Sequence, residues 1–509
     1  MTRPWFTGWL LVGALVACDG DDEVAGRVPT VSTVSVTPDS VFLFNAGLQQ
    51  AVRLTPNGQT LAQVHLELPG VVVDDLPLSG GAHAVLTQAS PALLVVAPDG
   101  MVTEIELPSP YTAMSLDPEG RWLVTWFRPG ETAVTDDVFL NVNQVSFVDL
   151  QNLASEVRTV VLQGSQPSRV DFVPDFTLAA NALSLVVASG EGTMVFVDPL
   201  SADPANQQRV VRLTPPESLS EPVPSAVRCA ARQLDGESRM LCTAIIRGFN
   251  EVFVIELLEG DTETGWTFQP TINLVNVPEN VEAAFDFDTT DGARMLVLTA
   301  TRAVRVVNPQ SRSSVSVPLA QFRNGALLFD TVEDGEVERQ AVLYRSGDPI
   351  VEFAELGRLE VEGDGAVTAR RLRAPVESIR PLAGSTDLAL ITYSSGAGVG
   401  ILQLSRRSEV SLTVQPGLVI AGITTLNSQV FARLNGDERL AIVDAATGLT
   451  SQLELERVPV QVAVLPGSGQ LMVQYQSEYL AFYNPASIAD GPYAYVNGLF
   501  FDGLFDRGQ

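Results

Sequence analysis

Residues 166–214 read QPSRVDFVPDFTLAANALSLVVASGEGTMVFVDPLSADPANQQRVVRLT, a pattern that recurs along the chain. It contains four short apolar runs rich in Val, Leu and Phe, at 169–174, 183–188, 194–197 and 209–213. Pro, Gly, Asn, Asp and Ser separate the runs. Short apolar runs bounded by turn-forming residues are typical of β-strands rather than of helices. The stretch therefore predicts a unit of four strands.

Variations of this unit recur along the chain, and the end of the third strand carries the clearest mark. There an apolar run ends in Asp or Asn, or in a weaker polar equivalent, at Asp149, Asp198, Glu256, Asn308, Glu355, Gln403, Asp444 and Asn484. Successive marks lie about 40 to 60 residues apart. A period of this length, with several strands per period and no helical pattern, indicates propeller blades of four strands each.

The eight marks predict an all-β fold, a β-propeller of eight four-stranded blades, with seven to nine as the range. Residues 31–107 contain further strand-like runs and leave two alternatives open. Part of them completes the last blade, so that strands from both termini close the ring, or they form a further blade. A β-helix or a pair of β-sandwiches is the structural alternative.

Hairpin turns are expected to recur with the same period as the blades. Asp-Gly and Asn-Gly pairs favour two-residue turns between antiparallel strands. Such pairs occur at Asp99-Gly100, Asp291-Gly292, Asp334-Gly335, Asp364-Gly365 and Asn435-Gly436.

Two segments resemble the blade openings of bacterial YVTN-type and WD40-like propeller proteins, namely QPSRVDFVPD at 166–175 and VQVAVLPG at 460–467. VSFVD at 145–149 and LAIVDAATG at 440–448 are similar to the third strand and following turn of those blades. The resemblance covers most of 111–485. The Tyr-Val-Thr-Asn motif itself is absent, as are the Gly-His and Trp-Asp dipeptides of WD40 blades. The resemblance therefore implies the fold and no particular activity.

The composition is that of a large folded protein with an acidic surface. Of the 509 residues, 46% are hydrophobic and 18% are charged, which is ample for a core and excludes a disordered chain. Acidic residues number 60 against 31 basic ones, for a net charge of -29. The sequence has no lysine, so every basic residue is an arginine. The negative electrostatic field of such a protein repels phosphates. It therefore argues against nucleic acids and anionic lipid headgroups as partners.

The N-terminus has the three zones of an export signal. Arg3 supplies a positive start, and an apolar run at 5–17 follows it. The run is shorter than the roughly 20 residues that span a bilayer, so it predicts a signal peptide rather than a membrane helix. Leu15-Val16-Ala17-Cys18 resembles the lipobox of bacterial lipoproteins. In that family the cysteine sulfur carries diacylglyceryl and the freed amine takes a further acyl chain such as palmitate.

The lipobox resemblance implies a domain order and a cellular address. Residues 1–17 are the signal peptide, 18–30 are an acidic flexible linker that begins with lipidated Cys18, and 31–509 form the propeller with a short C-terminal tail. The mature protein is then anchored to the inner or outer membrane of a bacterial cell envelope and faces the periplasm or the exterior. An ordinary cleaved signal with an incidental cysteine is the alternative.

The two remaining cysteines predict a disulfide. Asp235-Gly236 lies midway between Cys229 and Cys242 and favours a two-residue hairpin turn. Counting outward from that turn places the cysteines opposite each other in a non-hydrogen-bonded pair, where Cα atoms lie about 4.5 Å apart. A bridge would fit an oxidising compartment. Two buried free thiols are the alternative.

The sequence names no catalytic, cofactor-binding or metal-binding residue. His65 and His83 are the only histidines, and both lie in strand-like runs without a second histidine or a carboxylate at ligand spacing. A zinc site typically needs three protein ligands, and no Gly-x-Ser-x-Gly nucleophile motif occurs. No cofactor is predicted, although the acidic composition leaves a structural calcium ion open.

These observations lead to two functional hypotheses. The first is a lipid-anchored, non-enzymatic recognition or scaffold module at the cell envelope for a protein or glycan partner. Its loops and exposed rims would carry the function. The alternative is a propeller hydrolase or lyase of the lactonase or glycan-cleaving type, with a divalent metal held in the central channel by residues from several blades.

Overall fold

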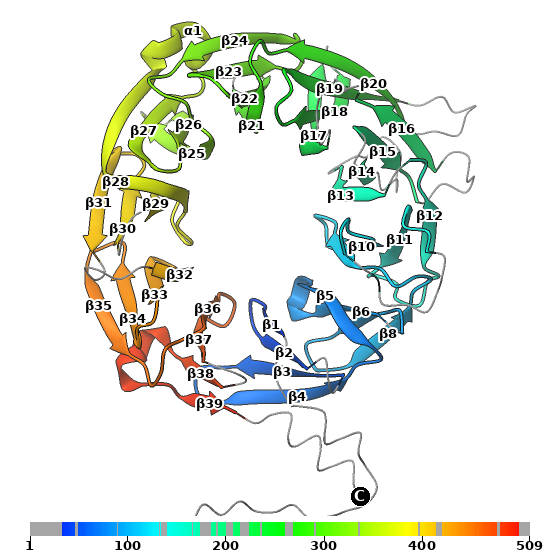
Figure 1. Ribbon diagram of the computed structural model, residues 1–509, viewed down its shortest axis with the longest axis vertical. Coiled ribbons are helices and arrows are strands. Elements are labelled where there is room, and N and C mark those ends of the chain that lie inside the picture. Colours follow the sequence, from blue (N-terminus) through cyan, green and yellow to red (C-terminus); the bar gives the residue numbers. More distant parts are fainter. Residues whose placement is uncertain are drawn as a thin grey trace, which may run out of the picture.

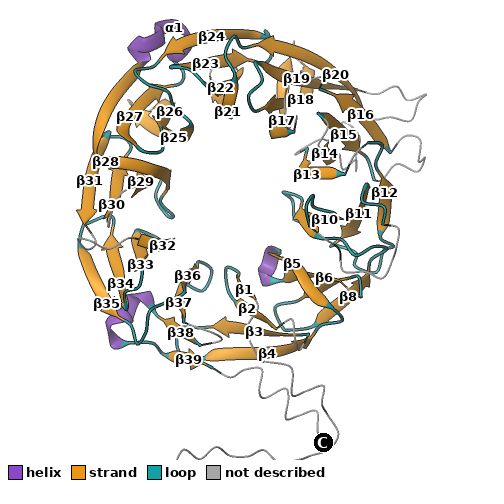
Figure 2. Ribbon diagram, in the orientation of Figure 1, coloured by secondary structure: helices purple, strands orange, loops and turns teal. Residues whose placement is uncertain are grey.

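Radially arranged antiparallel sheets form a ring in the computed structural model (Figure 1). The structure describes residues 33–497 apart from gaps at 46–48, 89, 132, 134–139, 165, 174–184, 190–191, 200–206, 214–222, 235–236, 260–267, 290–291, 334–335, 395–397, 414–419 and 476–478. The predicted signal peptide, Cys18 and the linker therefore lie outside the described residues, as does most of the tail. In the described part strands dominate and helical segments are short (Figure 2).

The first three sheets each contain four strands that follow one another in the chain. Their strands are β1 (Thr33–Val36), β2 (Val41–Asn45), β3 (Gln50–Pro56) and β4 (Leu61–Glu67), then β5 (Val71–Pro77), β6 (His83–Gln88), β7 (Ala92–Val96) and β8 (Val102–Glu106), then β9 (Ala113–Leu116), β10 (Trp122–Trp126), β11 (Gln144–Asp149) and β12 (Arg158–Val161).

The next three sheets have the same order. Their strands are β13 (Pro167–Phe172), β14 (Leu185–Ser189), β15 (Thr193–Val197) and β16 (Gln208–Arg212), then β17 (Pro224–Leu234), β18 (Glu237–Ile246), β19 (Glu251–Glu259) and β20 (Phe268–Asn276), then β21 (Val281–Thr289), β22 (Gly292–Thr299), β23 (Ala303–Asn308) and β24 (Ser313–Pro318).

The last third of the ring contains one sheet of seven strands and two of four. The seven strands are β25 (Gly325–Glu333), β26 (Glu336–Tyr344), β27 (Asp348–Glu355), β28 (Val367–Pro381), β29 (Leu388–Tyr393), β30 (Gly398–Gln403) and β31 (Ser408–Thr413). The final sheets are β32 (Ile420–Leu426), β33 (Gln429–Leu434), β34 (Arg439–Asp444) and β35 (Thr450–Glu454), then β36 (Gln461–Leu465), β37 (Gln470–Gln474), β38 (Leu480–Tyr483) and β39 (Ala494–Val496). The short helical segments are η1 (Ser79–Gly81), α1 (Leu359–Glu362), η3 (Gly363–Ala366) and η4 (Pro485–Asp490).

The predicted propeller of four-stranded blades is confirmed, and the four strands expected in 166–214 are β13 to β16. Every sequence mark lies in or directly after the third strand of its blade, at β11, β15, β19, β23, β27, β30, β34 and β38. The first strand of each blade lies toward the middle of the ring and the fourth toward its perimeter (Figure 1).

The ring contains more blades than the eight predicted, and more than the predicted range of seven to nine. The described residues form nine sheets, and the seven-stranded sheet holds two four-stranded units that share β28. The first half of β28 pairs with β27 and the second half with β29, which gives ten units in all. The difference arises because β1 to β8 form two complete blades of their own.

The ring closes by packing rather than by strand pairing. The alternative in which N-terminal strands complete the last blade is wrong, because β36 to β39 form that sheet by themselves. Leu43 and Val52 of the first sheet instead share an apolar cluster with Met472 and Phe482 of the last. The backbone N–H of Gly467 also donates to the carbonyl of Pro38 over 2.8 Å.

Burial between neighbouring blades explains why the middle strands read as unbroken apolar runs. All five residues of β7 and all five of β10 are buried, since adjacent sheets cover both of their faces. Trp122 and Phe147 of the third blade, for example, pack with Val195 of the fourth. The core is therefore a series of apolar layers between sheets.

Two of the expected Gly turns are confirmed and one is wrong. Gly100 and Gly436 lie between consecutive strands with φ of 88° and 70°, the left-handed conformation that such turns require. The Asp364-Gly365 pair lies instead in η3, because a helical connection joins β27 to β28. Asp291 and Asp334-Gly335 fall outside the described residues.

Candidate functional site

A pocket of about 330 Å³ lies at the inner rim, where the first strands of three consecutive blades meet. These strands are β9, β13 and β17, of which β9 and β17 lie more than 100 residues apart in the chain. Its walls combine apolar and polar side chains from Ser115, Leu116, Pro118, Val170, Asp171, Phe172, Val227, Arg228 and Cys229. A concave site with a few polar groups in apolar walls is typical of ligand recognition.

Asp171 is the acidic group of this pocket. Its carboxylate accepts a hydrogen bond from the guanidinium of Arg169, with 2.7 Å from Nη2 to Oδ1, and Arg169 Nε lies 2.7 Å from Oδ2. Partial burial raises the pKa of Asp171, while Arg169 and then Arg228 oppose the shift. Two residues apart on one strand, Arg169 and Asp171 lie on the same face of β13.

Arg228 is the basic group, and it connects the pocket to the next blade. Its side chain is 60% exposed and its Nε lies 3.7 Å from Oδ2 of Asp286 on β21. Arg228 also lines a second, much smaller pocket of about 20 Å³ that includes Asp286 and Arg294. Charges of alternating sign therefore follow the inner rim from β13 through β17 to β21.

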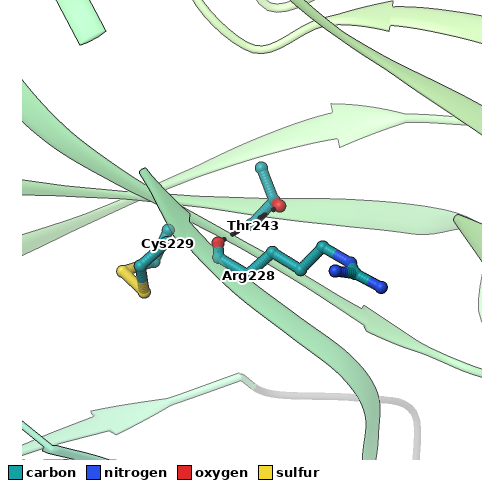
Figure 3. The surroundings of a disulfide bond; sticks show 4 residues. Arg228, Cys229 and Thr243 are labelled. Carbon is teal, nitrogen blue, oxygen red and sulfur yellow. Dashed lines mark hydrogen bonds between the residues drawn. A yellow bond between two sulfur atoms is a disulfide. The ribbon is translucent and has the colours of Figure 1, made fainter. Parts of the chain in front are cut away.

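The backbone under Arg228 is fixed by its neighbours (Figure 3). The hydroxyl of Thr243 donates to the carbonyl oxygen of Arg228 over 3.4 Å, and the side chains of Arg228 and Cys229 point to opposite sides of β17. Alternation along a strand explains this opposition. As a result the disulfide faces the fourth blade, while the guanidinium extends toward the sixth.

The predicted disulfide between Cys229 and Cys242 is confirmed. Leu234 pairs with Glu237, and outward counting along β17 and β18 brings the two cysteines opposite each other. Their Cα atoms are 4.0 Å apart, which fits the short, non-hydrogen-bonded type of pair. Cys242 is fully buried in the apolar cluster between the fourth and fifth blades. The Asp235-Gly236 turn itself lies outside the described residues.

The two histidines lie away from this pocket. His65 is exposed on β4, whereas His83 is fully buried at the start of β6. The Nε2 of His83 lies 2.9 Å from a carboxylate oxygen of Asp75, and the imidazole stacks on Phe42 with ring centroids 4.2 Å apart. The Asp75 partner, from the neighbouring strand β5 of the same blade, was not expected from the sequence. The stacking of His83 on Phe42 packs the second blade against the first.

The described residues contain neither a metal-binding cluster nor a membrane-spanning helix. Within residues 33–497, gaps excepted, no group of three or more His, Cys, Asp or Glu side chains could hold a metal ion. In the same residues, no helix is long and apolar enough to cross a membrane. The pocket offers the Asp171 carboxylate, the Ser115 hydroxyl and apolar walls, and Arg228 borders it on the side of the sixth blade. This set can bind and orient a partner.

Sequence reasoning did not select Asp171 or Arg228, because the blades that bring them together are distant in sequence. Arg169 and Asp171 do lie in the quoted blade opening, and their two-residue spacing places them on one strand face. Arg228 directly precedes Cys229, which was predicted to form a disulfide with Cys242. Neither the spacing of Arg169 and Asp171 nor the position of Arg228 predicts which strands are neighbours around the ring.

Comparisons with known proteins concern the architecture alone. No protein-family model matches the sequence, and no curated protein matches it. Among solved structures, the dihydro-heme d1 dehydrogenase NirN in complex with DHE has a TM-score of 0.41 at 14% identity, over 75% of this chain and 74% of that one.

The WD40 domain of SCAP from fission yeast has a TM-score of 0.39 at 10% identity, over 82% and 95% of the two chains. The Dos1 propeller has a TM-score of 0.39 at 9% identity, over 71% and 89%. These structural neighbours are WD40 and other propeller domains, and likeness at this level says nothing of ligand or activity. The chain is a β-propeller on the arrangement of its own sheets.

Proposed function

We propose that the protein is a lipid-anchored recognition module of a bacterial cell envelope, without catalysis of its own. Its ring would present the inner rim to a protein or glycan partner. The observation that carries this proposal is the pocket at β9, β13 and β17, because three blades supply its walls and its charged groups. A rigid ring of packed sheets holds such groups in fixed positions.

The disulfide supports the proposed address. Bridges form and persist in oxidising compartments such as the periplasm or the cell exterior, and they are rare in the cytosol. Cys229 and Cys242 are paired in the fifth blade. The export signal and the Leu15-Val16-Ala17-Cys18 segment favour the same side of the membrane. Acylation at Cys18 would then keep the ring at the membrane surface through two or more chains.

The anchor is tested by mass spectrometry of the mature N-terminal peptide after expression of the full chain in a bacterium. We expect Cys18 as the first residue, carrying diacylglyceryl and a further acyl group. The C18S variant should lose both the acyl groups and the membrane fraction. A wild-type N-terminus without lipid would contradict the lipoprotein proposal.

The recognition surface is tested by site-specific photo-crosslinking in envelope preparations. A photoreactive phenylalanine replaces Arg228 at the inner rim, and the matched control carries it at Arg212, which is exposed on the perimeter strand β16. We expect a discrete adduct from position 228 and none from position 212. Identical adduct patterns at the two positions would reject the inner rim as the recognition surface.

A further inference from the structure

A second polar and aromatic cluster lies on the last blade, away from the inner-rim pocket. It contains Glu456 and Arg457 from the connection between β35 and β36, Tyr479 before β38, and Tyr495 in β39. Tyr495 belongs to the outermost strand of its sheet, on the perimeter of the ring (Figure 1). We call these four residues the tyrosine platform.

The two rings of the platform are held parallel. Tyr479 and Tyr495 have centroids 5.8 Å apart and ring planes only 8° apart. The guanidinium of Arg457 lies 5.2 Å from the centroid of Tyr479. Tyr475 adds a further ring contact to Tyr479 at 5.2 Å. These contacts fix the orientation of Tyr495 before any ligand arrives.

A single carboxylate holds both hydroxyl groups. Tyr479 donates to Oε2 of Glu456 over 2.7 Å, and Tyr495 donates to Oε1 over 2.6 Å. Partial burial and the nearby carboxylate raise the pKa of Tyr479 to about 12, so its hydroxyl remains a donor. The same hydrogen bonds lower the pKa of Glu456. A carboxylate offers about four acceptor positions, and the two tyrosines use half of them.

Part of the platform is open to solvent. Tyr495 is 47% exposed, and its ring lies parallel to that of Tyr479 with centroids 5.8 Å apart, so a large part of Tyr495 is accessible to a ligand. An aromatic face attracts the C–H groups of an apolar surface, and the adjacent carboxylate accepts hydrogen bonds from hydroxyl groups. A pyranose ring presents both features, C–H groups on one face and hydroxyl groups around its edge.

We propose that the tyrosine platform is a carbohydrate-binding site for a neutral glycan, with a sugar ring stacked on Tyr495 and a sugar hydroxyl donating to Glu456. The charge of the protein favours a neutral ligand, since a net charge of -29 and the Glu456 carboxylate repel uronic acids and sulfated sugars. The inference rests on the proposed recognition role only for its choice of a glycan partner. Its test uses the unacylated C18S protein, so a failure here leaves the anchor and the inner rim untouched.

The test is titration of three neutral hexasaccharides, cellohexaose, laminarihexaose and maltohexaose, by calorimetry and by ligand-observed saturation-transfer NMR. We expect at least one to bind with a Kd on the order of 1 mM, typical of a single open platform. The Y495A variant should lose detectable binding, and Y495F should retain it within about threefold because the ring stays in place. The E456Q variant should bind about tenfold more weakly.

The controls separate the site from the fold. The M101A variant removes another exposed apolar side chain, 65% exposed in the second blade, and should bind as the wild type does. Oligogalacturonate should bind more weakly than the neutral sugars. Failure of all three neutral hexasaccharides to bind would overturn the proposal. So would unchanged binding in Y495A, with circular dichroism used to verify that the variant is folded.

Discussion

At the scale of single residues, the interface between the first two blades depends on a buried arginine. Arg53 is 2% exposed, and its guanidinium donates to the carbonyls of Ala97 over 2.6 Å and Gly81 over 2.9 Å. It also lies over the ring of Phe42, at 5.5 Å from the centroid. Burial lowers the pKa of Arg53, and the charges of nearby acidic side chains offset part of that shift.

The R53M variant keeps the length of the side chain but removes the guanidinium donor from both carbonyls, and Ala97 then keeps only the backbone N–H of Gly100. We expect it to lower the free energy of unfolding by about 3 kcal/mol, as for a buried charged donor with several acceptors. The matched control R302M changes an exposed arginine and should stay within about 0.5 kcal/mol of the wild type. Equal effects of the two variants in denaturant unfolding would argue against the buried role of Arg53.

The disulfide gives a second prediction at this scale. The bridge closes a loop with a sequence separation of 13 residues, and opening it should lower the free energy of unfolding by about 3 kcal/mol. Reductant should therefore destabilise the wild type, whereas the C229A/C242A double variant should unfold identically with and without reductant. A wild type that is indifferent to reductant would show that the bridge is absent or without consequence.

Single residues were predictable from sequence where local pairing decides their position. Cys229 and Cys242 are joined by one hairpin, so counting from its turn was sufficient. Asp171 and Arg228 lie on different blades, and His83 meets Asp75 across two strands of one blade. Their proximity depends on sheet twist and blade packing, which the repeat pattern alone does not specify.

At the scale of elements, the third strands of the blades were predictable from the sequence, but the sharing of β28 by two four-stranded units was not. The polar residue that ends a buried strand marks the point where the chain leaves the core, and all eight marks correspond to strands. β28 contains no turn between its two halves, because Ala374-Pro375 lies within the continuous strand. Pro375 lacks an N–H group, and the pairing passes from β27 to β29 close to it.

The final strand, β39, is held in place through Glu456, and this contact predicts a dependence on pH. Hydrogen bonds from Tyr495 and Tyr479 lower the pKa of Glu456 from its ordinary value of 4.5. A carboxyl group whose pKa is lower in the folded state stabilises the fold fully at pH values above its unfolded-state pKa. This stabilisation is lost as the pH falls through its folded-state pKa. The contribution is therefore present at pH 7 and lost in acid.

We expect the E456Q variant to have a lower Tm than the wild type at pH 7, and the difference should be smaller at pH 3, because lower pH favours protonation of Glu456. Other carboxylates titrate equally in both proteins, so the difference between the two Tm values isolates Glu456. Scanning calorimetry at the two pH values provides the measurement. A Tm difference that is unchanged at pH 3 would show that Glu456 acts through packing and not through its charge.

At the scale of the whole molecule, the ring depends on contact between its first and last sheets. Gly467 lies at this seam, and a Cβ atom on it would come within 2.1 Å of Oδ1 of Asp39. The sequence predicted a ring of four-stranded blades but not the manner of closure, because a seam formed by packing leaves no shared strand to detect. The count of blades was too low because β1 to β8 form two complete blades that carry none of the eight sequence marks.

The G467A variant should therefore disturb the seam. We expect a loss of about 1–3 kcal/mol in the free energy of unfolding, the usual cost of forcing a methyl group into a filled space. The G357A variant is the control, since a Cβ atom there meets nothing within 4 Å. Limited proteolysis should cut G467A faster than G357A, and equal rates would contradict closure through this contact.

The closed propeller of ten four-stranded units can be tested by a crystal structure of residues 31–509. We expect the sheet of β1 to β4 to pack on the sheet of β36 to β39, and β28 to belong to two units of one seven-stranded sheet. An open arc of sheets, or two separate sandwiches in place of a ring, would contradict it.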